Sequence, residues 1–185
     1  MTTVSRPEGD LRTQLRSFTR DSHERLDARL ARYDLTDPED RQRFCAIQYR
    51  GFSDLGDACG WDAAEATSAL RDIHAALAVE LGLPVSRSSD PSTRPLHPDA
   101  VAYVTLGSQL GTEAMKRAMP EEQRRGAFGL APDSDAWRAF RTRIAEDPGD
   151  EASRQRILDD ARAAFDIFLA ASGTDFSREN ENSAI

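Results

Sequence analysis

The spacing of the apolar residues constrains the fold more than any other feature of this chain. They recur every three or four positions, which places them on one face of an amphipathic helix. In the first such stretch, residues 11–33, they are Leu11, Leu15, Phe18, Leu26, Leu30 and Tyr33. No segment alternates apolar and polar residues at the period of a strand, and no unit of roughly 20 to 50 residues repeats. The sequence therefore predicts an all-α fold.

Cap and turn residues divide this pattern into separate helices. Asp10 is a candidate N-cap for the first helix, and Pro38 after Asp37 is typical of the opening of the second, which ends near Gly56 or Gly60. The remaining predicted elements are a third helix at 62–81, a fourth at 99–119, a short helix or turn at 121–130, a fifth from Asp133 to about 146, and a last helix at 151–171.

The chain of 185 residues is long enough to bury roughly 70% of the surface that its unfolded form exposes. Segment 84–98, with four prolines and several serines, is the only linker-like stretch, and the helices on either side of it lack the apolar area to fold separately. We therefore expect a single domain at 10–172, with flexible tails at 1–9 and 173–185.

Charge and composition exclude several classes of protein. The 24 basic and 32 acidic residues give a formal charge of −8, which argues against nucleic-acid binding. The apolar runs are far shorter than the ~20 residues that span a bilayer. Cys45 and Cys59 are too few for a disulfide framework, so free thiols in a cytoplasmic protein are expected.

The first predicted helix carries the residue with the clearest chemical potential. His23 falls at the edge of the apolar stripe, with Thr19 beneath it and Arg20 and Arg16 one and two turns away. One imidazole nitrogen there can ligate a metal while the guanidinium groups pair with carboxylates. The alternative is a partly buried histidine with a structural hydrogen bond.

The fourth predicted helix contains two glycines, Gly107 and Gly111, at its centre. Each costs roughly 1 kcal/mol relative to alanine, so the helix gives up about 2 kcal/mol. Two explanations remain open: another helix packs closely against these positions, or a planar ligand lies against the bare backbone.

Together these segments resemble the heme oxygenases, particularly the bacterial enzymes that supply biliverdin to phytochromes. The first two motifs that carry the resemblance are Thr19-x3-His23-x2-Leu26 and Tyr103-Val-x-x-Gly107-Ser108-x-Leu110-Gly111. The resemblance makes the first the proximal helix, with His23 as the axial ligand of the heme iron, and the second the distal helix, with its glycines against the heme.

Two later segments extend the resemblance over most of the chain, from about Leu11 to Ala171. Trp137-x2-Phe140-Arg141 is similar to the segment whose arginine pairs with a heme propionate, and Ala161-x3-Phe165-x2-Phe168 resembles the closing helix with its pocket aromatics. The order and spacing of the four motifs are more specific than any single motif.

The resemblance implies oxidative cleavage of protoheme to biliverdin, ferrous iron and carbon monoxide, with O2 and external electrons. Heme would be both substrate and cofactor. A ferredoxin or a reductase would supply the electrons, and a bacteriophytochrome would accept the biliverdin. Arg16, Arg20 and Arg141 are the implied propionate partners, and Gly107, Ser108 and Gly111 line the implied oxygen site.

Two positions depart from the family pattern. Ser108 stands where many members have an aspartate, and a serine holds a water but does not change charge. Thr112 replaces the second of a pair of glycines, and its β-branched side chain points away from the heme or intrudes on it. The alternatives are a heme or tetrapyrrole-binding protein without degradation activity, and a helical scaffold that binds only protein partners.

Other candidates are weaker. His74 and His97 have no ligand spacing to another histidine, cysteine or carboxylate pair, so a structural or solvated role is expected. A second group of cations would form either a basic rim for an acidic redox partner or a helix C-terminus that favours cations: Lys116, Arg117, Arg124 and Arg125, with Arg12 and Arg20 added for the rim.

Overall fold

The computed structural model describes residues 10–61, 66–85, 94–146 and 149–173, and within them all regular elements are helical. This confirms the all-α prediction. No helix in the described ranges is long and apolar enough to cross a bilayer. The elements are α1 (Leu11–Leu30), α2 (Pro38–Cys59), α3 (Ala66–Leu81), α4 (Pro98–Lys116), the short 3-10 helices η1 (Glu121–Gln123) and η2 (Gly126–Gly129), α5 (Ser134–Glu146) and α6 (Glu151–Ala171).

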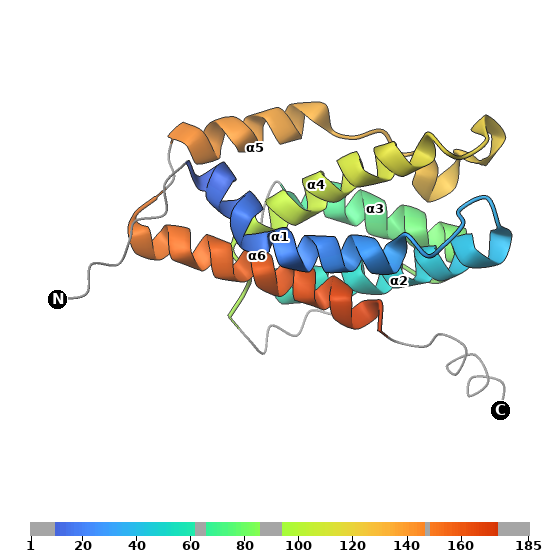
Figure 1. Cartoon of the computed structure of the whole chain (residues 1–185), viewed down its shortest axis with the longest axis horizontal. Coiled ribbons are helices and arrows are strands. Elements are labelled where there is room, and N and C mark those ends of the chain that lie inside the picture. The colour runs from blue at the N-terminus through green and yellow to red at the C-terminus, as the bar shows by residue number, and fades with distance from the viewer. Residues whose placement is uncertain (1–9, 62–65, 86–93, 147–148, 174–185) are drawn as a thin grey trace.

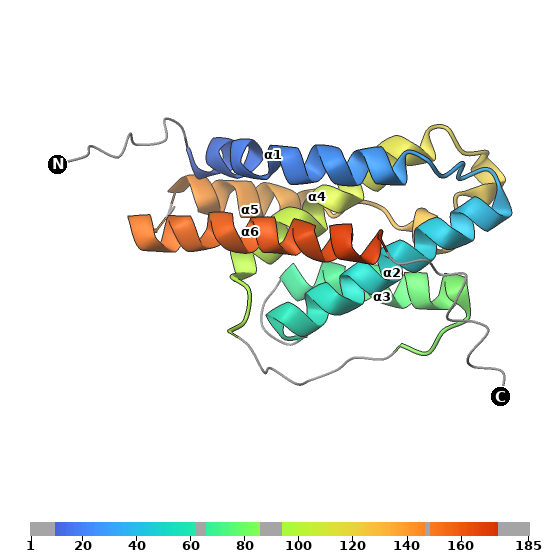
Figure 2. The ribbon, with the colours of Figure 1, turned by 60° about the horizontal axis from the view of Figure 1, so that its bottom comes forward.

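Helix α6 is the element on which the others assemble. It runs parallel to α1 along most of its length, and α2 and α4 also pack against it (Figures 1 and 2). Helix α3 packs on α2 and α4, whereas α5 packs on α1 and α4. Because α1 and α4 are both held by α6 and make little contact with each other, space remains between them.

Side-chain caps explain where the helices begin. The Asp10 carboxylate accepts the Thr13 amide N–H at 2.8 Å, which confirms the predicted cap, and Asp37 accepts the amide N–H groups of Glu39 and Asp40. Pro38 occupies the first turn of α2, where its missing N–H costs nothing.

Two helices end earlier than predicted. Helix α1 stops at Leu30 instead of Tyr33, because the Tyr33 amide bonds to the Leu30 carbonyl in a tight turn. Helix α4 stops at Lys116 instead of Met119, since Pro120 disfavours the helical conformation at the residue before it. The predicted start of the third helix at 62–65 lies outside the described residues, as do the tails 1–9 and 174–185.

The buried side chains form two adjoining clusters, and α6 contributes to both. Phe52 and Phe168 belong to one cluster, in which their rings meet edge to face with centroids 4.9 Å apart. Phe140 and Ala161 belong to the other. Tyr103 is packed against both, so the helices that precede and follow the linker share one core.

A buried carboxylate fastens the described end of the linker to α6. Asp160 is 3% exposed and accepts hydrogen bonds from the Arg94 guanidinium at 2.6 Å and from the His97 amide N–H at 2.8 Å. The Nδ1 atom of His97 in turn accepts the Asp99 amide N–H at 3.2 Å and caps α4. Burial lowers the pKa of His97 and favours the neutral ring that this cap requires.

The two cysteines are free, as the sequence predicts, and the structure shows both to be buried. Burial raises the pKa of Cys45 to about 12 and that of Cys59 to about 11. Because the thiolate is the reactive form, neither thiol is poised for chemistry.

Candidate functional site

The space between α1 and α4 is a cavity of about 520 Å³, which lies in the size range of small-molecule sites. Helix α1 forms one wall, α4 forms another, and α6 contributes the aromatic rings of Phe165 and Phe168. All but one of the residues that the sequence analysis assigns to the expected heme site line this cavity: Arg16, Thr19, Arg20, His23, Tyr103, Gly107, Ser108, Gly111, Thr112, Phe165 and Phe168.

The exception is Arg141. It is exposed on α5 and lines a separate surface hollow that it shares with Asp10 and Arg138. Phe140 is buried in the core, and a helical step of about 100° turns the next side chain away from the cavity. From α5 it is instead Trp137 that reaches the cavity wall. The structure therefore does not place Arg141 where it could pair with a ligand in this cavity.

His23 is held by a carboxylate one turn along the same helix. Its Nδ1 atom lies 3.0 Å from Oδ2 of Asp27, and its ring meets the Phe165 ring edge-on with centroids 5.5 Å apart. The side chain is 55% exposed, so water or a ligand can reach the other nitrogen, Nε2. A histidine that ligates a metal usually has its second ring nitrogen bonded in this way. The sequence contains a signal for this pair, the spacing of four between His23 and Asp27, but the motif around His23 ends at Leu26 and does not include Asp27.

Thr19 joins the two walls. Its side chain is buried, and its hydroxyl donates to the Leu15 carbonyl at 2.8 Å. The hydroxyl oxygens of Thr19 and Tyr103 lie 3.5 Å apart, and because the Thr19 proton is already used, Tyr103 is the donor between them. This contact links α1 to α4 beneath His23.

The glycines of α4 differ from those of α2. A Cβ atom at Gly51 would lie 2.4 Å from the Phe168 ring, and one at Gly56 would lie 2.2 Å from the Trp61 ring, so both allow close packing. A Cβ atom at Gly107 or Gly111 would meet nothing within 4 Å. Packing of a neighbouring helix is therefore the wrong explanation for the α4 pair. Their backbone faces the open cavity.

Ser108 and Thr112 also face the cavity from α4. The Ser108 hydroxyl donates to the Thr105 carbonyl at 2.7 Å, so toward the cavity it offers only acceptor capacity. Of the two orientations that the sequence leaves open for Thr112, the structure has the one toward the cavity.

The positive charge of the site lies on α1. Arg12, Arg16 and Arg20 are exposed and line the cavity mouth on the side of His23. Arg20 lies 3.6 Å from the Asp21 carboxylate, a pair open to solvent and therefore weak. These guanidinium groups present planar, bidentate donors to an anionic group at the mouth.

Two cations of the second group, Lys116 and Arg124, make contacts outside the cavity. Lys116, the only lysine of the chain, is buried and donates to the Leu130 carbonyl and to Glu113. Arg124 donates twice to the Met119 carbonyl. These contacts occupy both side chains and remove them from a basic rim.

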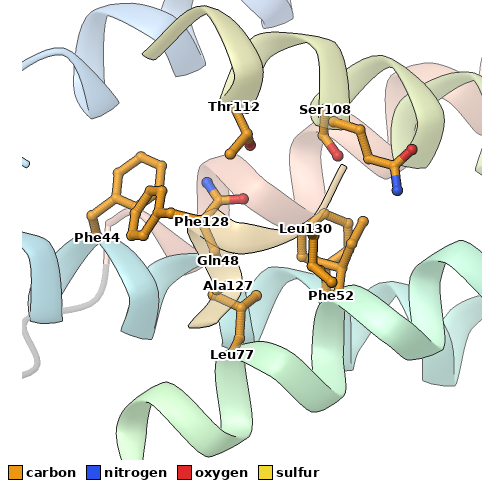
Figure 3. Close-up of a pocket in the computed structure, with 11 residues that line it drawn as sticks. Phe44, Gln48, Phe52, Leu77, Ser108, Thr112, Ala127, Phe128 and Leu130 are labelled. Carbon is orange, nitrogen blue, oxygen red and sulfur yellow. The ribbon is translucent and has the colours of Figure 1, made fainter. Parts of the chain in front are cut away.

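One residue that the sequence did not place in the site also lines this region. Gln48 of α2 lines the cavity together with Ser108 and Thr112. The same three residues also line a second, smaller hollow of about 40 Å³, whose other walls are mostly apolar, with Phe44, Phe52 and Leu77 among them (Figure 3). A glutamine within the apolar stripe of a helix was the available signal.

Within the described residues, no group of three or more histidine, cysteine, aspartate or glutamate side chains is arranged to hold a metal ion. His23 alone would thus serve a metal that brings its other ligands with it, as a metalloporphyrin does.

No family model matches the chain, and a search of curated proteins finds no match. What the protein does is therefore inferred from the cavity and its residues.

Proposed function

We propose that this protein is a heme oxygenase, which binds protoheme between α1 and α4 and cleaves it to biliverdin, ferrous iron and carbon monoxide with O2 and external electrons. One observation carries the proposal. A single histidine backed by a carboxylate stands on one wall of a 520 Å³ cavity, and the bare backbone of two glycines forms part of the wall on α4.

The residues present fit a flat, dianionic macrocycle. Gly107 and Gly111 leave unfilled space against the helix backbone, where any larger residue would place a side chain. The aromatic rings of Phe165 and Phe168 supply apolar surface at the closed end, whereas the cations lie only at the mouth. A ligand with an apolar body and two carboxylates at one edge matches this distribution.

Each residue then has a definite task. His23 would hold the iron through Nε2, with Asp27 fixing the orientation of the imidazole. Of the three expected partners for the propionates, Arg16 and Arg20 would serve, without Arg141. When bound, heme supplies the iron at which oxygen is activated. Ser108 can accept a hydrogen bond from a water on the α4 side of the cavity.

A second candidate function is heme binding without degradation. Two observations favour it: Thr112 faces the cavity and occupies part of the α4 wall, and the Ser108 hydroxyl is committed to the Thr105 carbonyl. Neither side chain is an acid that delivers a proton at neutral pH.

Anaerobic titration with hemin, followed by admission of air with a chemical reductant, separates these functions. An oxygenase forms a Soret band that then gives way to biliverdin absorption. A heme-binding protein without activity keeps its Soret band, and a protein that forms none contradicts both proposals.

The variant His23→Ala tests the ligand. We expect it to lose the Soret maximum of the wild-type complex and the turnover. The matched control is His97→Asn, which changes a histidine that lies outside the cavity and keeps a side chain able to cap α4. An unchanged spectrum and turnover in His23→Ala would make the assignment wrong.

A further inference from the structure

The two cavities described above meet at one polar side chain. Gln48 is partly buried on α2 and lines both the large cavity and the small hollow, at the place where they share Ser108 and Thr112 of α4. Figure 3 shows its carboxamide pointing from α2 toward α4, on the side where these two residues lie. Phe44 and Phe52, one turn away on either side along α2, line the small hollow with Gln48 and give it apolar surface.

The carboxamide is an uncommitted donor at this place. In the part of the chain that the structure describes, no hydrogen bond joins the Gln48 side chain to another residue. The hydroxyls of Ser108 and Tyr103 differ from it, because Ser108 donates to the Thr105 carbonyl and Tyr103 lies within reach of Thr19. A primary amide offers two N–H donors and one acceptor, and apolar surroundings strengthen the bonds that it makes.

We propose that Gln48 is a positioning residue that donates a hydrogen bond to a small ligand, such as water or a diatomic molecule, held on the α4 side of the large cavity. This rests on the proposed function, since the ligand would be held beside bound heme, on the side of the cavity that α4 forms. Ser108 would accept a hydrogen bond from a water at the same place. Gln48 thus supplies a donor that Ser108 lacks.

Fluoride is a suitable probe, because the anion accepts hydrogen bonds and its binding to the ferric hemin complex is read from the absorption spectrum. We expect Gln48→Leu to weaken fluoride binding by roughly tenfold, the effect of losing one hydrogen bond. It should also move the pH at which the complex changes from its acid to its alkaline spectrum. Gln48→Glu, which replaces the donor by a carboxylate of the same shape, should weaken fluoride binding further above the pKa of the new group.

The matched control is Gln42→Leu, a change of the same kind on the exposed face of α2. It should leave fluoride affinity and the pH of the spectral change as in the wild type. If both Gln48 variants bind hemin normally and fluoride as tightly as the control, the inference is overturned while the proposed function stands. If the wild type forms no Soret band that depends on His23, the proposed function fails and the inference with it. Thermal unfolding of each apoprotein identifies a variant that is merely misfolded.

Discussion

The two glycines of α4 offer a test in which a single methyl group should act in opposite directions on stability and on ligand binding. In Gly107→Ala the added Cβ atom meets nothing within 4 Å. A central helical glycine costs roughly 1 kcal/mol relative to alanine, so the variant should raise the free energy of unfolding of the apoprotein by about that amount. For a chain of 185 residues this corresponds to a rise of about 2 to 4 °C in Tm.

The same methyl group enters the space that the heme would occupy. Inserting a methyl group into a filled site costs roughly 1 to 3 kcal/mol, so hemin affinity should fall between about fivefold and a hundredfold. Thermal unfolding of the apoprotein and a hemin titration followed at the Soret band measure the two effects separately.

The control lies on α2. In Gly51→Ala the Cβ atom would lie 2.4 Å from the Phe168 ring, which is buried and has little freedom to move. This variant should lower the free energy of unfolding by about 1 to 3 kcal/mol. If Gly107→Ala destabilises the apoprotein as Gly51→Ala does, the claim that the space beside Gly107 is open is wrong. If it stabilises the apoprotein and leaves hemin affinity unchanged, no ligand lies against that wall.

Four further predictions address single contacts. Thr112→Gly should raise hemin affinity or turnover, and a titration with no change would mean that the threonine does not crowd the ligand. Asp27→Asn should weaken hemin binding by about tenfold to a hundredfold, because it removes the carboxylate that orients His23. Asp160→Ala should lower the free energy of unfolding, measured in urea, by about 1 to 3 kcal/mol, since the His97 amide loses its acceptor. Folding lowers the His97 pKa, so as the pH falls the imidazole takes up a proton in the unfolded chain before it does so in the folded protein. The free energy of unfolding should therefore fall as the pH drops below about 6.5. His97→Asn should reduce this dependence on pH, measured by urea unfolding at a series of pH values.

Much of the fold follows from local sequence. The apolar period locates every long helix, and capping side chains such as Asp10 and Asp37 explain their first residues, because both effects act within a few positions along the chain. The ends of α1 and α4 are predicted less well. There the chain leaves the helix through tight turns, while the apolar spacing continues to Tyr33 and Met119.

The sequence predicts most residues of the candidate site, but it does not predict how they are arranged around the cavity. His23, Gly107 and Gly111 are identifiable from their positions in helices, yet sequence alone leaves open what the glycines face. Arg141 shows the converse: its motif suggests a ligand contact, but the burial of Phe140 turns it toward solvent.

The sequence by itself thus determined that the chain is helical, where its helices lie, and which side chains are candidates for the site. Only the tertiary structure decided that α1 and α4 stand apart on α6 and that a cavity separates His23 from the bare backbone of Gly107 and Gly111. It also placed Gln48 of α2 in the lining of that cavity. The physical reason is that helix formation depends on interactions within a few residues, whereas the distance between two helices is set by the side chains of a third.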